Sequence, residues 1–347
     1  MRLAEFIEKV YLVNAKETKR RSTYKNYSDI FRIHVQPRIG DISLRRFRTM
    51  DAERLLKDVA AKAETPGGEP LSHSTLERVK AFLGSTFKCA KRLGAFDGAN
   101  PVKDSETPAG KASKPTHAYS ETEIAAILSV FPDEPVRTVL ILAANSGLRK
   151  SEMMGLLWKD YDGHTLKVAQ SLVNGFIQKP KTEASEAPVP VNRVLRAALA
   201  AHRVRQGEMG RDGFPILQSE VFTPLDLANL VKRTISPRLE QCIVCGEQKS
   251  EHGPTTGHLY ERNKTLPRWR GWHAFRRGLA TNLHAAGVQD KDIQGILRHS
   301  NVKITQDCYI KSIPQTRINA LEAQGEKHAQ AVEKAPNVHQ LNESRPN

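Results

Sequence analysis

The side chains best suited to chemistry lie mainly in the last third of the chain, in the segments GWHAFRRGLATNL and ILRHSNVKITQDCYIKS. With the upstream segments NSGLRKSE and KPKTEAS, they supply guanidinium, ammonium, imidazole and phenol groups in the order Arg149, Lys181, His273, Arg276, His299 and Tyr309. A guanidinium binds two phosphate oxygens at once and stays charged at any relevant pH. Two such groups, two imidazoles and a phenol are what phosphodiester chemistry through a covalent enzyme intermediate requires.

The physical chemistry of phosphodiester transfer explains why these groups belong together. An unperturbed tyrosine has a pKa of about 10, so a phenol that attacks near neutral pH needs a base or a strongly positive site. Neighbouring cations supply that site, and a protonated lysine can give its proton to the leaving oxygen. Because the arginines neutralise the charge that a metal would neutralise, no cofactor is expected for catalysis. The chain has no GxxxxGK[ST] sequence, so use of ATP is not expected either.

Two sequence boxes surround these residues. The segment SGLRKSE resembles the Gly-x-Arg-x-x-Glu box of tyrosine recombinases, and LRHSNVKITQDCY resembles their Leu-Gly-His box, which leads to the tyrosine. With the ordered residue set, the two boxes make most of the chain resemble the tyrosine recombinase (phage integrase) family.

The resemblance implies how the bond would be broken. Tyr309 would be the nucleophile, forming a 3′-phosphotyrosine and releasing a 5′ hydroxyl. Lys181, just past a predicted strand, would protonate the leaving oxygen, and His273 would assist proton transfer at the tyrosine.

The resemblance also implies how the phosphate would be held. Arg149 and Arg276 would clamp it, and His299 would form a hydrogen bond with one of its oxygens. Glu152 is interpreted as structural, holding the turn that carries Arg149.

Three positions depart from the family pattern. The tyrosine follows the box histidine by ten positions rather than the usual nine, and Cys308 occupies the usual place. Tyr309 is nevertheless the only phenol nearby. Arg298 stands where the box has glycine, and it either adds a phosphate contact or is simply tolerated. Lys179 lies two positions before Lys181 and is an alternative to it.

The bulk composition indicates a basic protein without a membrane span. The chain has 347 residues and a net charge of +15, which favours a polyanionic partner such as nucleic acid. No stretch approaches the roughly 20 apolar residues of a transmembrane helix. Charges among the apolar residues of MRLAEFIEKVYLVNAKETKRR argue against a signal peptide. Four cysteines do not make a secreted disulfide framework, so we expect a cytoplasmic location.

Apolar periodicity and breaker residues predict a multidomain organisation. Residues 1–103 read as an all-α domain, which the resemblance implies is the DNA-binding (core-binding) domain, and residues 104–117, rich in Pro, Ser, Lys and Gly, read as a linker. Residues 118–325 are expected to form a mixed α/β catalytic domain, mainly helical with a small antiparallel sheet. It carries a Cys/His insert at 240–262, and a polar tail follows at 326–347.

Local signals place several element boundaries. Capping boxes at Ser74-x-x-Glu77 and Ser120-x-x-Glu123 predict helix starts, and Gly147 predicts a helix end. Asn174-Gly175 predicts a hairpin, and PVPV at 188–191 predicts a short edge strand.

The insert contains a second group of chemically capable side chains. Cys242-x-x-Cys245-Gly246 is similar to a zinc knuckle, and His252 and His258 follow at a spacing that can complete a tetrahedral site. A redox C-x-x-C pair and four unrelated loop residues are the alternatives. If the insert binds zinc, all four ligands come from the protein, so the metal is structural rather than catalytic.

The resemblance implies a site-specific recombinase or integrase of a mobile element, acting on DNA without ATP. The alternatives are a catalytically inactive DNA-binding regulator and a type IB topoisomerase. The expected partners are double-stranded DNA at recombination sites and further copies of the chain in a homotetramer on DNA. Accessory DNA-bending proteins stay an open alternative, and no membrane partner is expected.

Overall fold

The computed structural model describes residues 1–61, 71–111, 116–132, 135–179, 186–253 and 256–303, together with Gln306 and Glu326. Contacts along the backbone divide the chain into two compact units, Met1–Pro115 and Thr116–Asn347. Each unit has its own hydrophobic core.

The first unit is helical in its described part. A continuous helical run opens it, with a π-helical turn η1 (Ile7–Tyr11) between two α-helical pieces. Its elements are α1 (Leu3–Phe6), η1, α2 (Leu12–Thr18), α3 (Arg21–Ile30), η2 (Phe31–Val35), α4 (Gln36–Ile39), η3 (Leu44–Arg46), α5 (Thr49–Ala61) and α6 (His73–Arg92). The amphipathic pattern of the sequence therefore corresponds to real helices.

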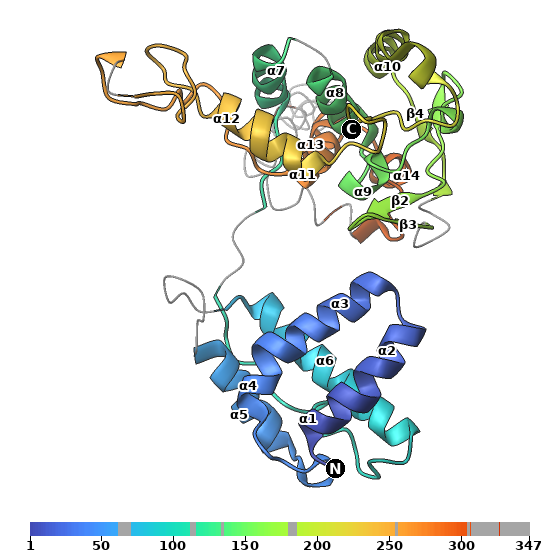
Figure 1. Ribbon diagram of the computed structural model, residues 1–347, viewed down its shortest axis with the longest axis vertical. Helices are drawn as coiled ribbons and strands as arrows, with labels where there is room; N and C mark the ends of the chain where they lie inside the picture. The colour runs from blue at the N-terminus through green and yellow to red at the C-terminus, as the bar shows by residue number, and fades with distance from the viewer. Residues whose placement is uncertain are drawn as a thin grey trace, which may run out of the picture. The chain divides into compact units, whose positions relative to one another are not determined.

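Helix α6 is the centre of this unit and contacts both α3 and α5 (Figure 1). Its Leu83 and Leu56 of α5 are fully buried and belong to the same hydrophobic core. The ring of Phe82 packs edge-on against Tyr11 and Tyr27, with centroids 5.6 Å apart in both pairs. Aromatic contacts of this kind join the first helical run to α3 and α6.

The start of α6 differs from the prediction. The sequence favours Ser74 as the capping residue with Glu77 as its partner, whereas the structure has Ser72 as the N-cap. The hydroxyl oxygen of Ser72 accepts a hydrogen bond from the backbone N–H of Thr75 at 3.3 Å. The helix begins two residues earlier than predicted, because Ser72 already has the extended backbone that an N-cap needs.

Part of the predicted linker packs on the first unit. Ser105 is buried and donates a hydrogen bond to the carbonyl of Val102. The backbone N–H of Lys111 donates to the carbonyl of Leu71 at 3.0 Å. Residues 104–111 are therefore held by the helical unit.

The second unit mixes helices with short strands. Its helical elements are α7 (Glu121–Val130), α8 (Val136–Ser146), α9 (Lys150–Met153), η4 (Trp158–Asp160), α10 (Arg193–Gln206), η6 (Gly207–Gly210), α11 (Leu227–Leu230), η7 (Val231–Ile235), α12 (Ser236–Leu239), α13 (Trp272–Ala285) and α14 (Asp290–Leu297). Its strands are β1 (Thr165–Leu166), β2 (Ser171–Val173), β3 (Phe176–Gln178) and β4 (Val189–Pro190). In the described part of the chain, no helix is long and apolar enough to cross a membrane.

The strands form two antiparallel pairs. Strands β2 and β3 make the hairpin predicted at Asn174-Gly175, with Leu172 opposite Ile177. Both turn residues have positive φ, at +51° and +79°, as a tight hairpin turn requires. Strand β4 falls within the predicted PVPV strand and pairs with β1. The mainly helical unit with small antiparallel strands is confirmed.

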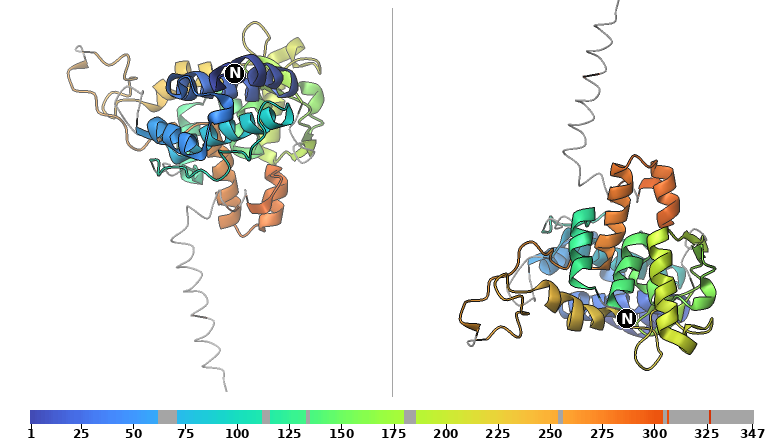
Figure 2. Two further views of the ribbon diagram at one scale, coloured as in Figure 1. Left: turned by 90° about the horizontal axis from the view of Figure 1, so that it is seen from below. Right: turned by 90° about the horizontal axis from the view of Figure 1, so that it is seen from above.

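Helix α8 lies at the centre of the second unit, in contact with α7, α10 and α13. Its apolar residues are nearly all buried, which suits a helix covered on every side. The capping box predicted at the start of α7 is present, with Ser120 and Glu123 each accepting from the other's backbone N–H. Helices α13 and α14 lie side by side, as Figure 2 shows.

Candidate active site and a Cys–His cluster

Arg149 lies in the turn between α8 and α9. Helix α8 ends at Gly147, whose backbone is left-handed with φ +63°. The backbone N–H of Arg149 then donates to one carboxylate oxygen of Glu152 at 2.9 Å, and its Nη1 donates to the other at 2.7 Å. The prediction that Glu152 holds this turn is confirmed.

Arg276 joins three segments of the second unit. It extends from α13, and only 6% of it is exposed. Its Nη1 donates a hydrogen bond to the carbonyl of Gly147, and its Nη2 donates to the carbonyl of Leu297. These bonds bring together the turn that carries Arg149, helix α13 and the end of α14. His299, two residues beyond Leu297, lies at the same place.

Arg298 replaces the glycine of the family box and is an internal residue. It caps α14 with a left-handed backbone, φ +55° and ψ +45°, a conformation in which glycine is the common residue. Its guanidinium is 1% exposed and lies 2.7 Å from the carboxylate of Glu152. Glu152 is thus shared between Arg149 and Arg298. Of the two interpretations left open, a phosphate contact does not fit, because the side chain points into the protein and pairs with a carboxylate.

The charges around Glu152 set its protonation. Burial alone would raise the pKa of Glu152, but the guanidinium of Arg298 and the backbone and side chain of Arg149 outweigh burial and lower it. The carboxylate therefore stays ionised and holds both guanidinium groups.

Both imidazoles of the site favour the neutral form. Burial, followed by the positive charge of Arg276, lowers the pKa of His299 to about 4. The same two causes, in the same order, lower the pKa of His273. Since Arg149 contributes to both shifts, the two rings and the two guanidinium groups act on one another electrostatically. Neutral imidazoles near neutral pH can accept a proton.

Two of the predicted site residues are not placed. Lys181 and Tyr309 lie outside the described residues, as does Cys308. Lys179, the alternative to Lys181, is described, and it is an exposed residue just after β3. The structure brings Arg149, His273, Arg276 and His299 together.

Two residues that sequence reasoning missed hold α13 in place. The hydroxyl of Tyr119 donates to the carbonyl of Arg268 and accepts from the backbone N–H of Arg270, just before α13. Arg277 donates from Nε to the carbonyl of His117 at 2.6 Å. The available signal was the position of Tyr119 directly before the N-cap of α7, where a side chain often packs against its helix.

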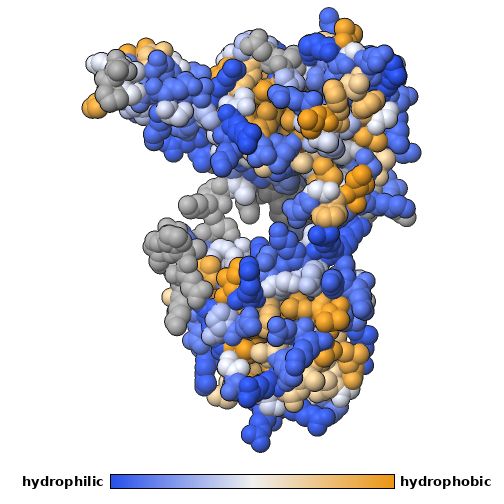
Figure 3. Space-filling model, viewed as in Figure 1, coloured by the Kyte–Doolittle hydropathy of each residue, from blue (hydrophilic) through white to orange (hydrophobic). Residues whose placement is uncertain are grey.

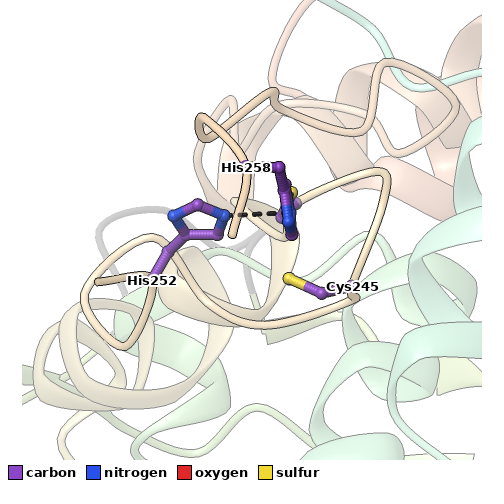
Figure 4. A group of neighbouring side chains, drawn as sticks. Cys245, His252 and His258 are labelled. Carbon is purple, nitrogen blue, oxygen red and sulfur yellow. Dashed lines mark hydrogen bonds between the residues drawn. The ribbon is translucent and has the colours of Figure 1, made fainter. Parts of the chain in front are cut away.

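The four Cys and His residues of the insert converge. One ligand atom from each of Cys242, Cys245, His252 and His258 lies within 4.8 Å of the others. The Nε2 atoms of the two histidines are 3.1 Å apart, and the Sγ of Cys242 is 3.3 Å from Nε2 of His258. Figure 4 shows both rings and the sulfur of Cys245 directed toward one another.

The insert leaves the body of the second unit after α12 and returns before α13. Figures 1 and 2 both show it as a projecting loop, and hydrophilic residues predominate on its visible surface in Figure 3. Arg262 closes its base, donating to the carbonyls of Leu239 and Leu266 and pairing with Glu240. The cluster is therefore separate from the Arg149 site in the fold.

The architecture agrees with known proteins. A model of the phage integrase N-terminal SAM-like domain matches residues 3–59. A tyrosine recombinase XerC-like protein of Caldanaerobacter subterraneus subsp. tengcongensis is 26% identical over 72% of this chain, and the match spans 66% of that relative. Among solved structures, the Tn1549 transposon integrase bound to transposon right end DNA superposes with a TM-score of 0.68 at 20% identity, over 95% of this chain and 100% of that one. A lambda integrase tetramer bound to a Holliday junction gives 0.60 at 16% identity, over 89% and 77% of the two chains.

The fold is that of the integrase structures. The described part of the first unit is helical, and the second unit combines helices with short strands. This fold, the matched N-terminal domain and the similarity to a curated recombinase together support assignment to the tyrosine recombinase family.

Proposed function

We propose that the protein is a site-specific DNA recombinase that cleaves and rejoins strands through a 3′-phosphotyrosine. The observation that carries this proposal is the junction made by Arg276, which gathers Arg149 and His299 beside α13. Two guanidinium groups and two neutral imidazoles at one place suit a phosphodiester whose charge grows during attack.

The proposed roles follow from the chemistry of each group. Arg149 and Arg276 bind the non-bridging oxygens of the scissile phosphate, and His299 contributes a hydrogen bond to one of them. His273, neutral near pH 7, accepts the proton that Tyr309 loses as its oxygen attacks phosphorus. Lys181 gives a proton to the departing 5′ oxygen. Preorganised donors of this kind are each worth roughly 10²–10³ in rate.

The partner is double-stranded DNA. A net charge of +15 supports binding dominated by phosphate contacts and therefore weakened steeply by salt. The first unit is proposed as the core-binding domain and the second as the catalytic domain. Exchange between two duplexes requires four strand cleavages, so we propose a homotetramer on DNA, the state in which lambda integrase was solved on a Holliday junction.

No cofactor takes part in the proposed reaction. The arginines supply the positive charge at the phosphate, and the phosphotyrosine keeps the energy of the broken bond for rejoining. The Cys–His cluster belongs to the projecting insert and is proposed to have no part in the chemistry.

Covalent trapping tests the proposal. The protein and its Tyr309→Phe and Cys308→Ser variants are incubated with nicked DNA from the flanks of the coding region, denatured, and examined for a protein–DNA adduct. We expect an adduct with wild type and Cys308→Ser and none with Tyr309→Phe. The serine variant is the matched control, because Cys308 occupies the place where the family pattern has its tyrosine.

The other outcomes overturn parts of the proposal. An adduct that persists in Tyr309→Phe and disappears in Cys308→Ser would move the nucleophile to the cysteine. Tight binding without any adduct would favour a DNA-binding regulator. Relaxation of supercoiled DNA lacking the flanking sequences would favour a type IB topoisomerase.

A further inference from the structure

The projecting insert has almost no hydrophobic core of its own. Among its described residues from Gln241 to Asn263, Cys242 is the only buried side chain. Ile243, Val244 and Leu259 are 49%, 67% and 92% exposed. Apolar burial cannot account for a defined fold in so short a segment, and small domains of this kind depend on a metal or a disulfide.

The backbone of the insert nevertheless follows a defined path. The N–H of Cys242 donates to the carbonyl of Glu247 at 2.8 Å, and the N–H of Gly246 donates back to Cys242 at 3.0 Å. Gly246 has φ +75°, which glycine adopts without strain. This tight turn directs both sulfurs of the C-x-x-C segment to one side.

The donor atoms match the geometry of a tetrahedral metal. A zinc ion with bonds of about 2.3 Å to sulfur and 2.0 Å to nitrogen has donor–donor edges of about 3.3 to 3.8 Å. The Nε2 atoms of His252 and His258 are 3.1 Å apart, and the Cys242 sulfur lies 3.3 Å from Nε2 of His258. These two edges are within a few tenths of an ångström of those in a loaded site, and all four donor atoms lie within 4.8 Å of one another.

A neighbouring carbonyl selects the ring nitrogen that faces the cluster. Nδ1 of His258 lies 2.8 Å from the carbonyl oxygen of Thr256, which can only accept, so Nδ1 carries the proton. Nε2 is then the nitrogen with a free electron pair, and it is the atom directed at Cys242 and His252. Histidine ligands of zinc usually have an outer partner of this type.

We propose that Cys242, Cys245, His252 and His258 bind one zinc ion that folds the insert. Two thiolates and two imidazoles are the donor set that zinc prefers, and with four protein ligands no position is open for substrate. The metal is a structural centre distinct from the Arg149 site. Through Arg262, it also stiffens the segment that joins α12 to α13.

Metal analysis is the first test. Wild type and a Cys242→Ser/Cys245→Ser variant are purified from zinc-supplemented cultures, with Cys89→Ser as the control. Cys89 is a buried cysteine of the first unit, remote in sequence from the insert. We expect about one zinc per chain in wild type and control, and a loss of at least tenfold in the double variant. Equal zinc in all three proteins would overturn the proposal.

Cobalt substitution keeps the test independent of how the variant folds. Wild-type protein is stripped by chelation and titrated with Co²⁺, and the absorption spectrum is followed. We expect saturation at about one equivalent with the visible bands of four-coordinate cobalt and a thiolate charge-transfer band. Bands of six-coordinate cobalt would overturn the proposed zinc site. A metal-free wild type with a Cys242–Cys245 disulfide would also overturn it and would favour a redox pair.

Hydrogen exchange separates a local role from a global one. Chelation should raise amide exchange in residues 241–263 and leave α8 unchanged. Because these measurements need no DNA, their failure is distinguishable from failure of the proposed recombinase function. Exchange that stays the same in the insert after metal removal would contradict a metal-dependent fold.

Discussion

At the scale of single residues, Glu152 is the group on which the site most depends. It satisfies the backbone N–H of Arg149, pairs with the guanidinium of Arg149 and pairs with the buried Arg298. One carboxylate therefore fixes a residue proposed to bind phosphate and neutralises another that is far from water. Removing its charge takes away the carboxylate that pairs with the buried guanidinium of Arg298.

We expect Glu152→Gln to lower the free energy of unfolding by about 3 kcal/mol, because it breaks the buried ion pair with Arg298. Tryptophan fluorescence in urea is the measurement, and it reports on the second unit alone because all three tryptophans, Trp158, Trp269 and Trp272, lie there.

The matched control for this substitution is Glu123→Gln. Glu123 also accepts from the N-cap N–H of its helix, but its partner is the half-buried His117 rather than a buried arginine. We expect a loss of about 1 kcal/mol there, the usual cost of a lost cap. Equal losses at the two positions would mean that the Arg298 pair contributes nothing to stability.

At the scale of elements, the turn between α8 and α9 positions Arg149, and Gly147 makes that turn. Its left-handed φ of +63° is costly for other residues, and a Cβ there would lie 2.7 Å from Cδ2 of Leu297. Leu297 ends α14, so the glycine lets two elements of the site approach closely.

We expect Gly147→Ala to cost about 1–2 kcal/mol from backbone strain, with an added cost from the displacement of Leu297. Gly287→Ala is the control, since Gly287 also follows a helix with positive φ, +82°, and has open space at its Cβ position. The same fluorescence measurement compares them. If the two variants lose the same stability, the close approach to Leu297 has no energetic importance.

Elements with local signals were predictable from sequence, and long-range pairs were not. Asn174-Gly175 and Ser120-x-x-Glu123 specify a turn and a cap within four residues, and both are present. Ser72 and Ser74 are chemically equivalent caps, so sequence could not choose between them. The pairing of Arg298 with Glu152 spans 146 positions and has no local signal. Likewise the spacing of the Cys and His residues indicated a candidate ligand set, but only the fold shows that the four side chains meet.

At the scale of the whole molecule, excess positive charge and buried imidazoles make stability depend on pH. The pKa of His299 is about 4 in the folded chain, against an unfolded value of about 6.5. Between about pH 6.5 and pH 4, the ring of His299 is therefore protonated in the unfolded chain and neutral in the folded chain. The contribution of the neutral ring to stability is complete above pH 6.5 and is lost as the pH falls toward 4.

The free energy of unfolding should fall with pH between about 6.5 and 4, and we expect His299→Gln to make this slope less steep. The reduction corresponds to about one proton, at most about 1.4 kcal/mol per pH unit. Urea unfolding followed by tryptophan fluorescence at half-unit pH steps measures the slope. His164→Gln is the control, because that exposed ring is in water in both states. A slope that His299→Gln leaves unchanged would show that the ring is not held neutral by its surroundings.

The Cys–His insert enters and leaves the second unit at one place, which makes it a site where the sequence can be altered by evolution or by engineering. Its two ends meet, because the N–H of Asn263 donates a hydrogen bond to the carbonyl of Gln241 at 2.8 Å. Beside them, Arg262 donates to the carbonyl of Leu239. A segment that enters and leaves at one point can be exchanged between Cys242 and Glu261 while Arg262 keeps its contacts with Leu239 and Leu266. The same position offers a place to graft a label or a foreign peptide onto the protein.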